Sequence, residues 1–270
     1  MKLKHVFTLL PLSGISALSF AEPLSFSCMI QPAQIVEIRS PITGTLQNLN
    51  VKAGSPIKKG QVLAKIEANV EKSATQTAYF RTQVKGNVAT AQAKISHASK
   101  KAERMKQLSA ENFVSKQAYD DSVNDLKQAQ AELQVARESL KQAEYEYKQS
   151  QADLNRRTIY SPFNGVVIQQ YIYTGSMVGP TEGKNPIFKI AQTDQYKVNA
   201  IIPLKYFRSL KVGQTVKIVP EAPFEKLVTT IKLNHVDQVI DASSGTFSAG
   251  ATIKSSQVKF PSGIRCKMFL

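Results

Sequence analysis

Residues 40–44 read Ser-Pro-Ile-Thr-Gly, and residues 161–165 repeat this pattern as Ser-Pro-Phe-Asn-Gly. A second glycine and then an apolar residue follow each copy at the same distances. We call the two copies half-motifs. Their shared positions are Ser40, Pro41, Gly44 and Gly54 in the first half-motif, and Ser161, Pro162, Gly165 and Gly175 in the second. A repeat in constant register indicates two equivalent structural segments.

Short runs that alternate apolar and polar residues surround the half-motifs, over residues 35–67 and 158–191. Glycines interrupt these runs, as at Gly54 and Gly60. The pattern is typical of short β-strands joined by tight turns. We therefore predict one small β-domain that is divided into two halves.

A different period occupies residues 68–157, between the two halves. Apolar residues recur at alternating spacings of four and three, at Val84, Val88, Ala91, Ile95, Ala98, Ala102 and Met105. A second series repeats every seven residues, at Leu126, Leu133, Leu140, Tyr147 and Leu154. Such heptads predict two coiled-coil helices, each roughly 40 residues long. We expect the first helix to continue through Gly86, which lies off its apolar face.

The two predicted helices are nearly equal in length and have a short connection, which favours an antiparallel hairpin with its tip at about residues 108–116. Gln, Lys and Glu cover the rest of each helix and leave no second apolar face to bury. We therefore expect the hairpin to project into solvent or toward a partner, rather than to lie inside an enzyme.

The region after the second half-motif is again strand-like. Its strand-like runs are residues 197–202, 215–219 and 228–233, with glycines at the turns between them. One short helix is expected at residues 205–210. The pattern predicts a small antiparallel β-barrel.

The N-terminus has the organisation of a secretory signal peptide. Lys2 and Lys4 precede an apolar run, and Ser19-Phe20-Ala21 supplies small residues before a cleavage site at Glu22. The alternative is an uncleaved anchor, although the apolar run is shorter than the ~20 residues of a spanning helix. Export implies the periplasm.

The chain contains two cysteines, Cys28 and Cys266. An even pair in an oxidising compartment favours a disulfide, and two separate buried thiols are the alternative. The formal net charge is +15. Because export argues against nucleic acid as a partner, we expect a basic surface that faces anionic lipid head groups or an acidic partner.

No catalytic or metal-binding arrangement is found in the sequence. Beyond the signal peptide the histidines are His97 and His235, and neither adjoins a cysteine or carboxylate cluster at metal-ligand spacing. A glycine-rich phosphate loop before a helix is also missing. We therefore expect neither an enzyme nor a cofactor or metal site.

Paired half-motifs, a hairpin between them and a β-barrel after them together resemble the periplasmic adaptors of tripartite efflux pumps, the membrane fusion proteins of the haemolysin-secretion (HlyD) type. The resemblance implies a non-catalytic homo-oligomer, peripheral to the inner membrane, that links an inner-membrane transporter to a TolC-type outer-membrane channel. Residues 236–247 and 261–266 resemble barrel turns of adaptors for resistance-nodulation-division (RND) pumps. ABC and MFS transporters are the alternatives.

The resemblance extends to the predicted hairpin tip. Arg104, Leu108 and Ser115 match the Arg-x3-Leu-x6-Ser pattern that such adaptors present to the outer-membrane channel. The resemblance therefore implies a channel contact at these residues. The alternative is that Arg104 is only solvated, that Leu108 closes the end of the hairpin and that Ser115 caps the second helix.

The half-motifs also resemble the two halves of a lipoyl or biotinyl carrier domain. The fold class is then α+β, elongated and multi-domain: a split lipoyl-like β-domain with an inserted antiparallel coiled-coil hairpin, followed by a small antiparallel β-barrel. In carriers a modified lysine lies on the turn between the halves, whereas here the helices occupy that place and Lys65 lies in the preceding strand. A lipoyl or biotinyl carrier and a structural coiled-coil envelope protein are the alternative functions.

The chain divides accordingly into five expected parts. These are the signal peptide (1–21), an N-terminal strand with the first lipoyl-like half (22–67), the hairpin (68–157), the second lipoyl-like half (158–192) and the β-barrel (193–270). Many such adaptors continue into a membrane-proximal domain built from both chain ends. We expect that domain to be missing or vestigial here.

Overall fold

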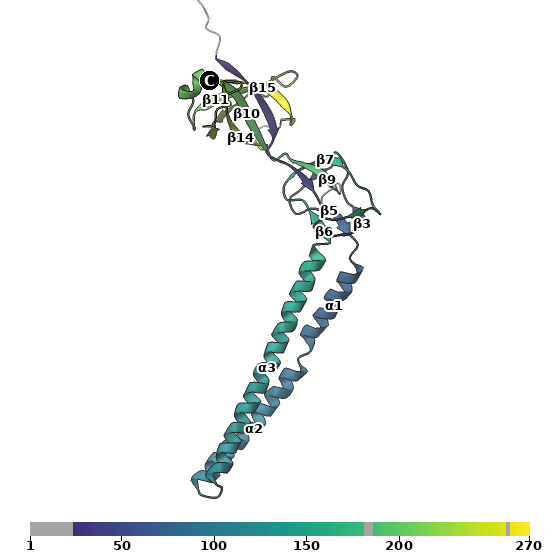
Figure 1. The fold of residues 1–270 in the computed structure, drawn as a ribbon, viewed down its shortest axis with the longest axis vertical. Helices are drawn as coiled ribbons and strands as arrows, with labels where there is room; N and C mark the ends of the chain where they lie inside the picture. The colour runs from purple at the N-terminus through teal and green to yellow at the C-terminus, as the bar shows by residue number, and fades with distance from the viewer. Residues whose placement is uncertain (1–23, 181–185, 258–259) are drawn as a thin grey trace, which may run out of the picture. The chain divides into compact units, whose positions relative to one another are not determined.

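The computed structural model describes residues 24–180, 186–257 and 260–270. The predicted signal peptide, residues 1–21, lies outside the described residues. The chain forms two units: the central unit is Gln34–Thr193, and the terminal unit combines the residues up to Ala33 with Asp194–Leu270. Figure 1 shows the elements of both.

The β-part of the central unit consists of two four-stranded sheets, and each sheet takes strands from both halves of the repeat. One has the order β2-β9-β7-β4 and the other β6-β5-β3-β8. The first half supplies β2 (Ile35–Ile38), β3 (Gly44–Leu49), β4 (Pro56–Ile57) and β5 (Val62–Ile66). The second half supplies β6 (Thr158–Tyr160), β7 (Gly165–Gln170), β8 (Met177–Val178) and β9 (Phe188–Gln192).

The two half-motifs pair with each other in an equivalent way. Gly44 lies opposite Val178 between β3 and β8, and Ile57 lies opposite Gly165 between β4 and β7. The backbone N–H of Gly54 donates to the carbonyl of Val167, and that of Gly175 donates to the carbonyl of Leu46, each at 2.8 Å. The prediction that the copies are complementary halves of one domain is therefore confirmed.

The serines and glycines of the half-motifs have identifiable structural roles. The buried hydroxyl of Ser161 donates to the carbonyl of Phe163 at 2.7 Å, and the buried Ser40 hydroxyl donates to the carbonyl of Ile42 in the same way. Gly54 and Gly175 have φ of 84° and 88°, a region that favours glycine.

Gly165 serves a different purpose, which is close approach of two strands. A Cβ atom at this position would overlap the carbonyl oxygen of Ala191 on β9. At the equivalent position in the first half, a Cβ on Gly44 would lie 2.7 Å from Cγ2 of Ile66 and 2.8 Å from Nη1 of Arg157. The contact at Gly165 therefore requires glycine, because a backbone carbonyl cannot move aside, whereas the side chains near Gly44 could shift.

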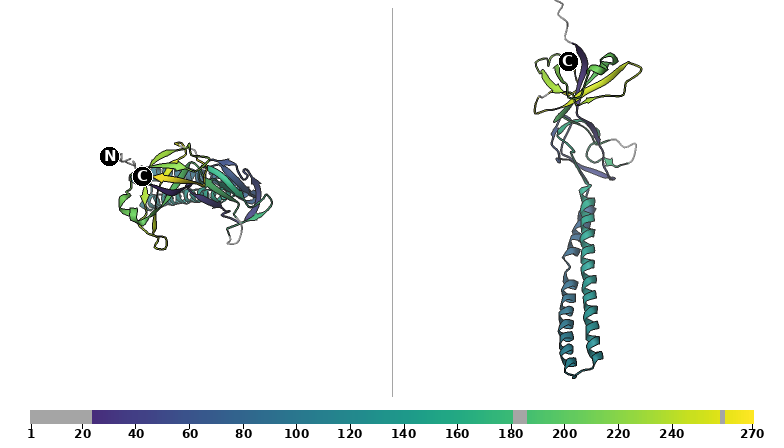
Figure 2. Two further views of the ribbon diagram at one scale, coloured as in Figure 1. Left: turned by 90° about the horizontal axis from the view of Figure 1, so that it is seen from above. Right: turned by 90° about the vertical axis from the view of Figure 1, so that its left-hand side faces the viewer.

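The segment between the halves is helical, as predicted, but it contains three helices rather than two. These are α1 (Asn69–Gln83), α2 (Gly86–Ala110) and α3 (Lys116–Asn155). Figure 2 shows α1 and α2 following one another along the single long α3. Both pack against α3, so the segment is a hairpin whose first arm is interrupted.

The expectation of a continuous first helix was wrong at Val84 and Lys85, which are not helical. Val84 is 62% exposed rather than part of the apolar seam. Apart from the small Ala78, the half-buried face of α1 consists of polar residues, Glu71, Thr75 and Thr82, so it offers little apolar surface to continue the seam to Val84. With a poor helix former at Gly86, the helix ends and restarts at this point.

The remaining seam of the hairpin is built mainly from small residues. Its fully buried members are Ala78, Ala91, Ala98, Ala102, Ser122, Ala129 and Leu133. Ion pairs flank the seam between Lys94 and Glu132 and between Lys101 and Asp125, each at 2.7 Å. The hydrogen bond from Lys94 lowers the pKa of the Glu132 carboxyl. Such exposed pairs add little stability but favour one register of the two arms.

The terminal unit is a seven-stranded antiparallel sheet with the order β12-β11-β15-β1-β10-β14-β13. Its strands are β1 (Ser25–Pro32), β10 (Gln195–Pro203), β11 (Thr215–Pro220), β12 (Thr229–Lys232), β13 (His235–Val236), β14 (Thr246–Lys254) and β15 (Ile264–Phe269). Only Leu233 and Asn234 separate β12 and β13, so one continuous chain segment forms both edges of the sheet and pairs with β11 and with β14. The sheet therefore closes on itself, as expected for a barrel.

Two sequence expectations change in this unit. The predicted short helix is a 3-10 helix at Leu204–Ser209. The N-terminal strand β1 pairs with β10 and β15 rather than with the first half-motif, so the predicted range 22–67 contains parts of both units. Phe26, Cys28 and Ile30 alternate into the core of the terminal unit and account for this placement.

Cys28 and Cys266 form a disulfide across β1 and β15, where the two residues lie directly opposite each other. Replacing both with Ala should lower the free energy of unfolding of the terminal unit by about 2–5 kcal/mol, because the bridge restricts a very long loop in the unfolded chain. Hydrogen exchange of the backbone amides of the terminal unit, followed by mass spectrometry at increasing urea, measures the loss. The helical circular dichroism signal, which reports on the central unit, should keep its midpoint. Equal exchange of the terminal unit in both proteins would contradict the prediction.

Among the described residues, no helix combines the length and the apolar character that crossing a membrane requires.

Candidate functional site at the hairpin tip

Helix α2 ends at the tip in a Schellman motif. The N–H of Phe113 donates to the carbonyl of Leu108 at 2.8 Å, and the N–H of Asn112 donates to the carbonyl of Ser109 at 3.1 Å. Asn112 has a φ of 62°, the left-handed conformation that this motif requires and that Asn tolerates better than most residues. The last carbonyls of α2 are thereby satisfied.

Helix α3 begins directly after this turn with a side-chain cap. Ser115 is the N-cap residue, and its hydroxyl accepts a hydrogen bond from the N–H of Ala118 at 3.2 Å. Because both helix ends are capped, the connection between them is a defined turn.

The tip exposes one large aromatic side chain and several cationic ones, among them Arg104, Lys106 and Lys116. Phe113 is 74% exposed. Arg104 is exposed, and its side chain forms no ion pair with any described residue. Leu108 is half-buried, four residues after Arg104 on the same side of α2. The structure therefore places all three predicted residues around the tip: Arg104 and Leu108 in the last turns of α2, and Ser115 at the start of α3.

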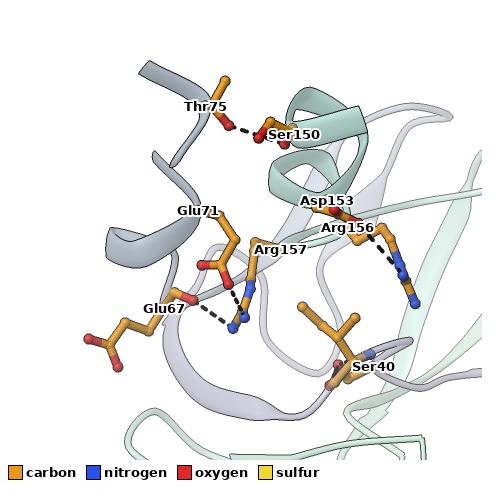
Figure 3. A network of polar contacts seen from close by, with 9 residues as sticks. Ser40, Glu67, Glu71, Thr75, Ser150, Asp153, Arg156 and Arg157 are labelled. Atoms are coloured by element: carbon orange, nitrogen blue, oxygen red, sulfur yellow. Dashed lines mark hydrogen bonds and ion pairs between the residues drawn. The ribbon is translucent and has the colours of Figure 1, made fainter. Parts of the chain in front are cut away.

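The base of the hairpin is tied to the β-part by two arginines at the end of α3, and Figure 3 shows the contacts of Arg157. Nη1 of Arg157 donates to the carbonyl of Glu67 at 3.0 Å, and Nη2 forms an ion pair with Glu71 on α1. Both side chains are only 20% exposed. Nη2 of Arg156 donates to the carbonyl of Pro41 in the first half-motif at 3.3 Å.

One further contact joins the arms near their base. Oγ1 of Thr75 donates to the carbonyl of Ser150 at 3.1 Å, as Figure 3 also shows. Together with Arg156 and Arg157, this contact connects α1, α3 and the first half-motif, so the hairpin is anchored at both of its arms.

The family model for the CzcB-like barrel-sandwich hybrid domain matches residues 34–192. The chain belongs to this family. The match covers the two β-halves together with the hairpin, and it confirms the predicted membership of the membrane fusion proteins.

Solved structures of other membrane fusion proteins share the fold. MacA from Actinobacillus actinomycetemcomitans has a TM-score of 0.73 at 22% identity, with 91% of this chain and 77% of that chain covered. Spr0693 from Streptococcus pneumoniae R6, a membrane fusion protein, has a TM-score of 0.59 at 18% identity, with 91% and 97% covered. A MacA chimera that carries the α-hairpin of Pseudomonas aeruginosa MexA has a TM-score of 0.55 at 22% identity, with 92% and 80% covered.

No curated protein matches the sequence.

Sequence analysis missed Phe113 and Asn112. A single aromatic residue in a polar connection could have indicated an exposed contact, and an Asn shortly before a serine cap could have indicated the left-handed turn. Neither residue belongs to a periodic pattern, so heptad reasoning did not find them.

The part of the chain that the structure describes contains no group of three or more His, Cys, Asp or Glu able to hold a metal. His97 lies on α2 and His235 on β13, in different units. Lys65 lies within β5, and the helical hairpin follows the strand where a carrier domain has its lysine turn.

Proposed function

We propose that this CzcB-like family member is the periplasmic adaptor of a tripartite efflux or secretion system. It connects an inner-membrane transporter to a TolC-type outer-membrane channel, and the hairpin tip is the part that contacts the channel. The observation that carries the proposal is the capped tip, which gathers Arg104, Leu108 and Ser115 and exposes Phe113 beside them.

The chemistry of the tip suits a protein contact. A planar guanidinium without an internal partner can donate to carboxylates or to backbone carbonyls at a helix end of the partner. Phe113 supplies a large apolar surface with few rotatable bonds, and aromatic residues and arginine dominate the binding energy of protein interfaces. Since both helix ends are capped, little conformational entropy is lost when the tip binds.

The rest of the molecule has supporting roles in this proposal. The β-domains of several copies pack side by side, the hairpins form the channel-facing part, and the terminal unit faces the transporter. Its barrel turns favour an RND transporter over ABC and MFS transporters. The protein works by coupling and sealing, without a chemical step. The arginine anchor at the hairpin base keeps the tip in a constant relation to the half-motifs during this coupling.

Photo-crosslinking in cells tests this function. A photoreactive residue at position 113 should crosslink to an outer-membrane channel protein, identified by mass spectrometry. Phe80 provides the matched control, because it is an exposed aromatic residue (58%) on α1, away from the tip. Crosslinks at position 80 should not contain the channel. If neither position yields an outer-membrane protein, or if both yield the same one, the tip assignment fails.

A further inference from the structure

The outer surface of the barrel in the terminal unit carries only one sign of charge. Strand residues that point outward include six cations and no carboxylate in the described part of this unit. The six are Lys197, Lys217, Lys232, Lys254, Arg265 and Lys267, and all are exposed. None of them forms an ion pair with another described residue.

The carboxylates of the same unit are kept off the strands. The described ones are Asp194, Glu221, Glu225, Asp237 and Asp241, and each lies in a connection between strands. Asp241 is engaged locally, since hydrogen bonds from Ser243 lower the pKa of its carboxyl to about 2. The outward surfaces of the described strands therefore carry cations alone, whereas the connections carry the carboxylates together with further cations such as Lys205, Lys211 and Lys226.

Four of the cations lie on neighbouring strands. Along the order β11-β15-β1-β10, Lys217 lies on β11, Arg265 and Lys267 lie on β15, and Lys197 lies on β10. We call these four residues the cationic sheet face. Arg265 stands directly opposite Met29 of β1 in the ladder.

Exposed apolar side chains lie among these cations. Met29 is 40% exposed and Ile201 on β10 is 64% exposed. Beside Lys217, a groove is lined by Val219, Thr230 and Phe269 among others. The surface therefore offers positive charge together with apolar contacts, which is the combination that an amphiphile with an anionic head group requires.

We propose that the cationic sheet face binds a membrane surface that contains anionic phospholipids. Protein interfaces are enriched in arginine and aromatic residues and depleted in lysine. Here three of the four cations are lysines, they are spread over several strands, and the aromatic residue beside them, Phe269, is half-buried. Lysine side chains on flexible stems suit the diffuse charge of a lipid surface, where each one strengthens binding about fivefold.

Vesicle sedimentation with the full chain tests this proposal. The protein should bind phosphatidylcholine vesicles that contain 30% phosphatidylglycerol, and it should not bind vesicles of phosphatidylcholine alone. Replacing Lys217, Arg265 and Lys267 together with Gln should weaken binding to the anionic vesicles about 100-fold, since three contributions of about fivefold are removed. High salt should weaken the binding of the unchanged protein similarly.

The control is a second triple variant with the same change in net charge. Lys100, Lys127 and Lys141 are exposed cations on the hairpin without ion-pair partners among the described residues, and their replacement with Gln should leave vesicle binding within about twofold of the original. Equal losses of vesicle binding in both triple variants would mean that only the net charge of the protein matters, which would overturn the proposal.

Two further measurements separate the remaining outcomes. The variant K217R/R265K/K267R keeps the three positive charges and should therefore keep its binding to anionic vesicles. Loss of binding in this variant would overturn the proposal, because the loss in the Gln variant would then reflect a fold defect or a specific contact rather than charge. No binding to anionic vesicles would also overturn it and would favour an acidic protein as the partner. The proposal does not depend on the adaptor function, because variants of the hairpin tip should bind vesicles normally.

Discussion

Replacement of Arg104 with Glu together with Leu108 with Ser should lower the affinity for the outer-membrane channel by about 100-fold or more. The double variant reverses the charge of an unpaired guanidinium and removes the apolar side chain beside it. Truncating a central interface residue commonly costs about 2 kcal/mol, and a reversed charge adds repulsion to the lost contact. Surface plasmon resonance with the purified channel measures the affinity, and drug susceptibility of cells measures the consequence for efflux.

The fold should survive this change. Arg104 is exposed, Leu108 is only half-buried at the end of the hairpin, and the Schellman hydrogen bonds involve backbone atoms. A matched control is Lys127→Glu with Val135→Ser, which applies the same kinds of change to exposed positions on the shaft of α3. Channel binding should be unchanged in this control. Unchanged binding in the tip variant would reject the tip as the contact site.

The second large effect is expected at Gly165. Gly165→Ala should lower the free energy of unfolding of the central unit by about 3 kcal/mol, because the new methyl group overlaps a backbone carbonyl that cannot move independently of its strand. The affected pair β7–β9 belongs to the same sheet as β2 and β4, so the disturbance reaches both halves. Urea unfolding monitored by circular dichroism at the helical band measures the change.

The same substitution at Gly86 should have the opposite effect on the free energy of unfolding. No atom lies within 4 Å of a Cβ at Gly86, and this residue begins α2 without a positive φ. Gly86→Ala should therefore raise the free energy of unfolding by about 0.5–1 kcal/mol, because alanine loses less conformational entropy in a helix. Destabilisation by both substitutions, or by neither, would contradict the steric explanation for the half-motif glycine.

Much of the central unit could be predicted because its determinants are periodic or repeated. The constant offset between the half-motifs predicted that Gly44 and Gly165 occupy equivalent places, and the ladder pairs them with Val178 and Ile57 in an equivalent way. The heptads identified the sides of α2 and α3 that face each other, because they too are a repeated pattern. A pattern of spacing reports which face is buried, and the structure retains that face at Ala91, Ala98 and Leu133.

The features that sequence analysis missed depend on single residues or on distant partners. The break between α1 and α2 at Val84 follows from the mostly polar face of α1. Counting heptads placed Val84 in the apolar seam, because spacing alone does not show whether a side chain has a partner on α3. Strand β1 was assigned no partner, because its neighbours β10 and β15 lie at the other end of the chain. Phe113 is one residue without a periodic context. The net charge of +15 was visible, but the absence of carboxylates from the described strands of the terminal unit appears only once the strand boundaries are known.

The position of β1 between β10 and β15 has a consequence for the biogenesis of the protein. Synthesis from the N-terminus delivers Cys28 first, and Cys266 follows 238 residues later. The central unit, which is contiguous in the sequence, is complete before either neighbour of β1 has been synthesised. Strand β10 follows directly and can pair with one edge of β1, whereas the other edge stays unpaired until β15 arrives.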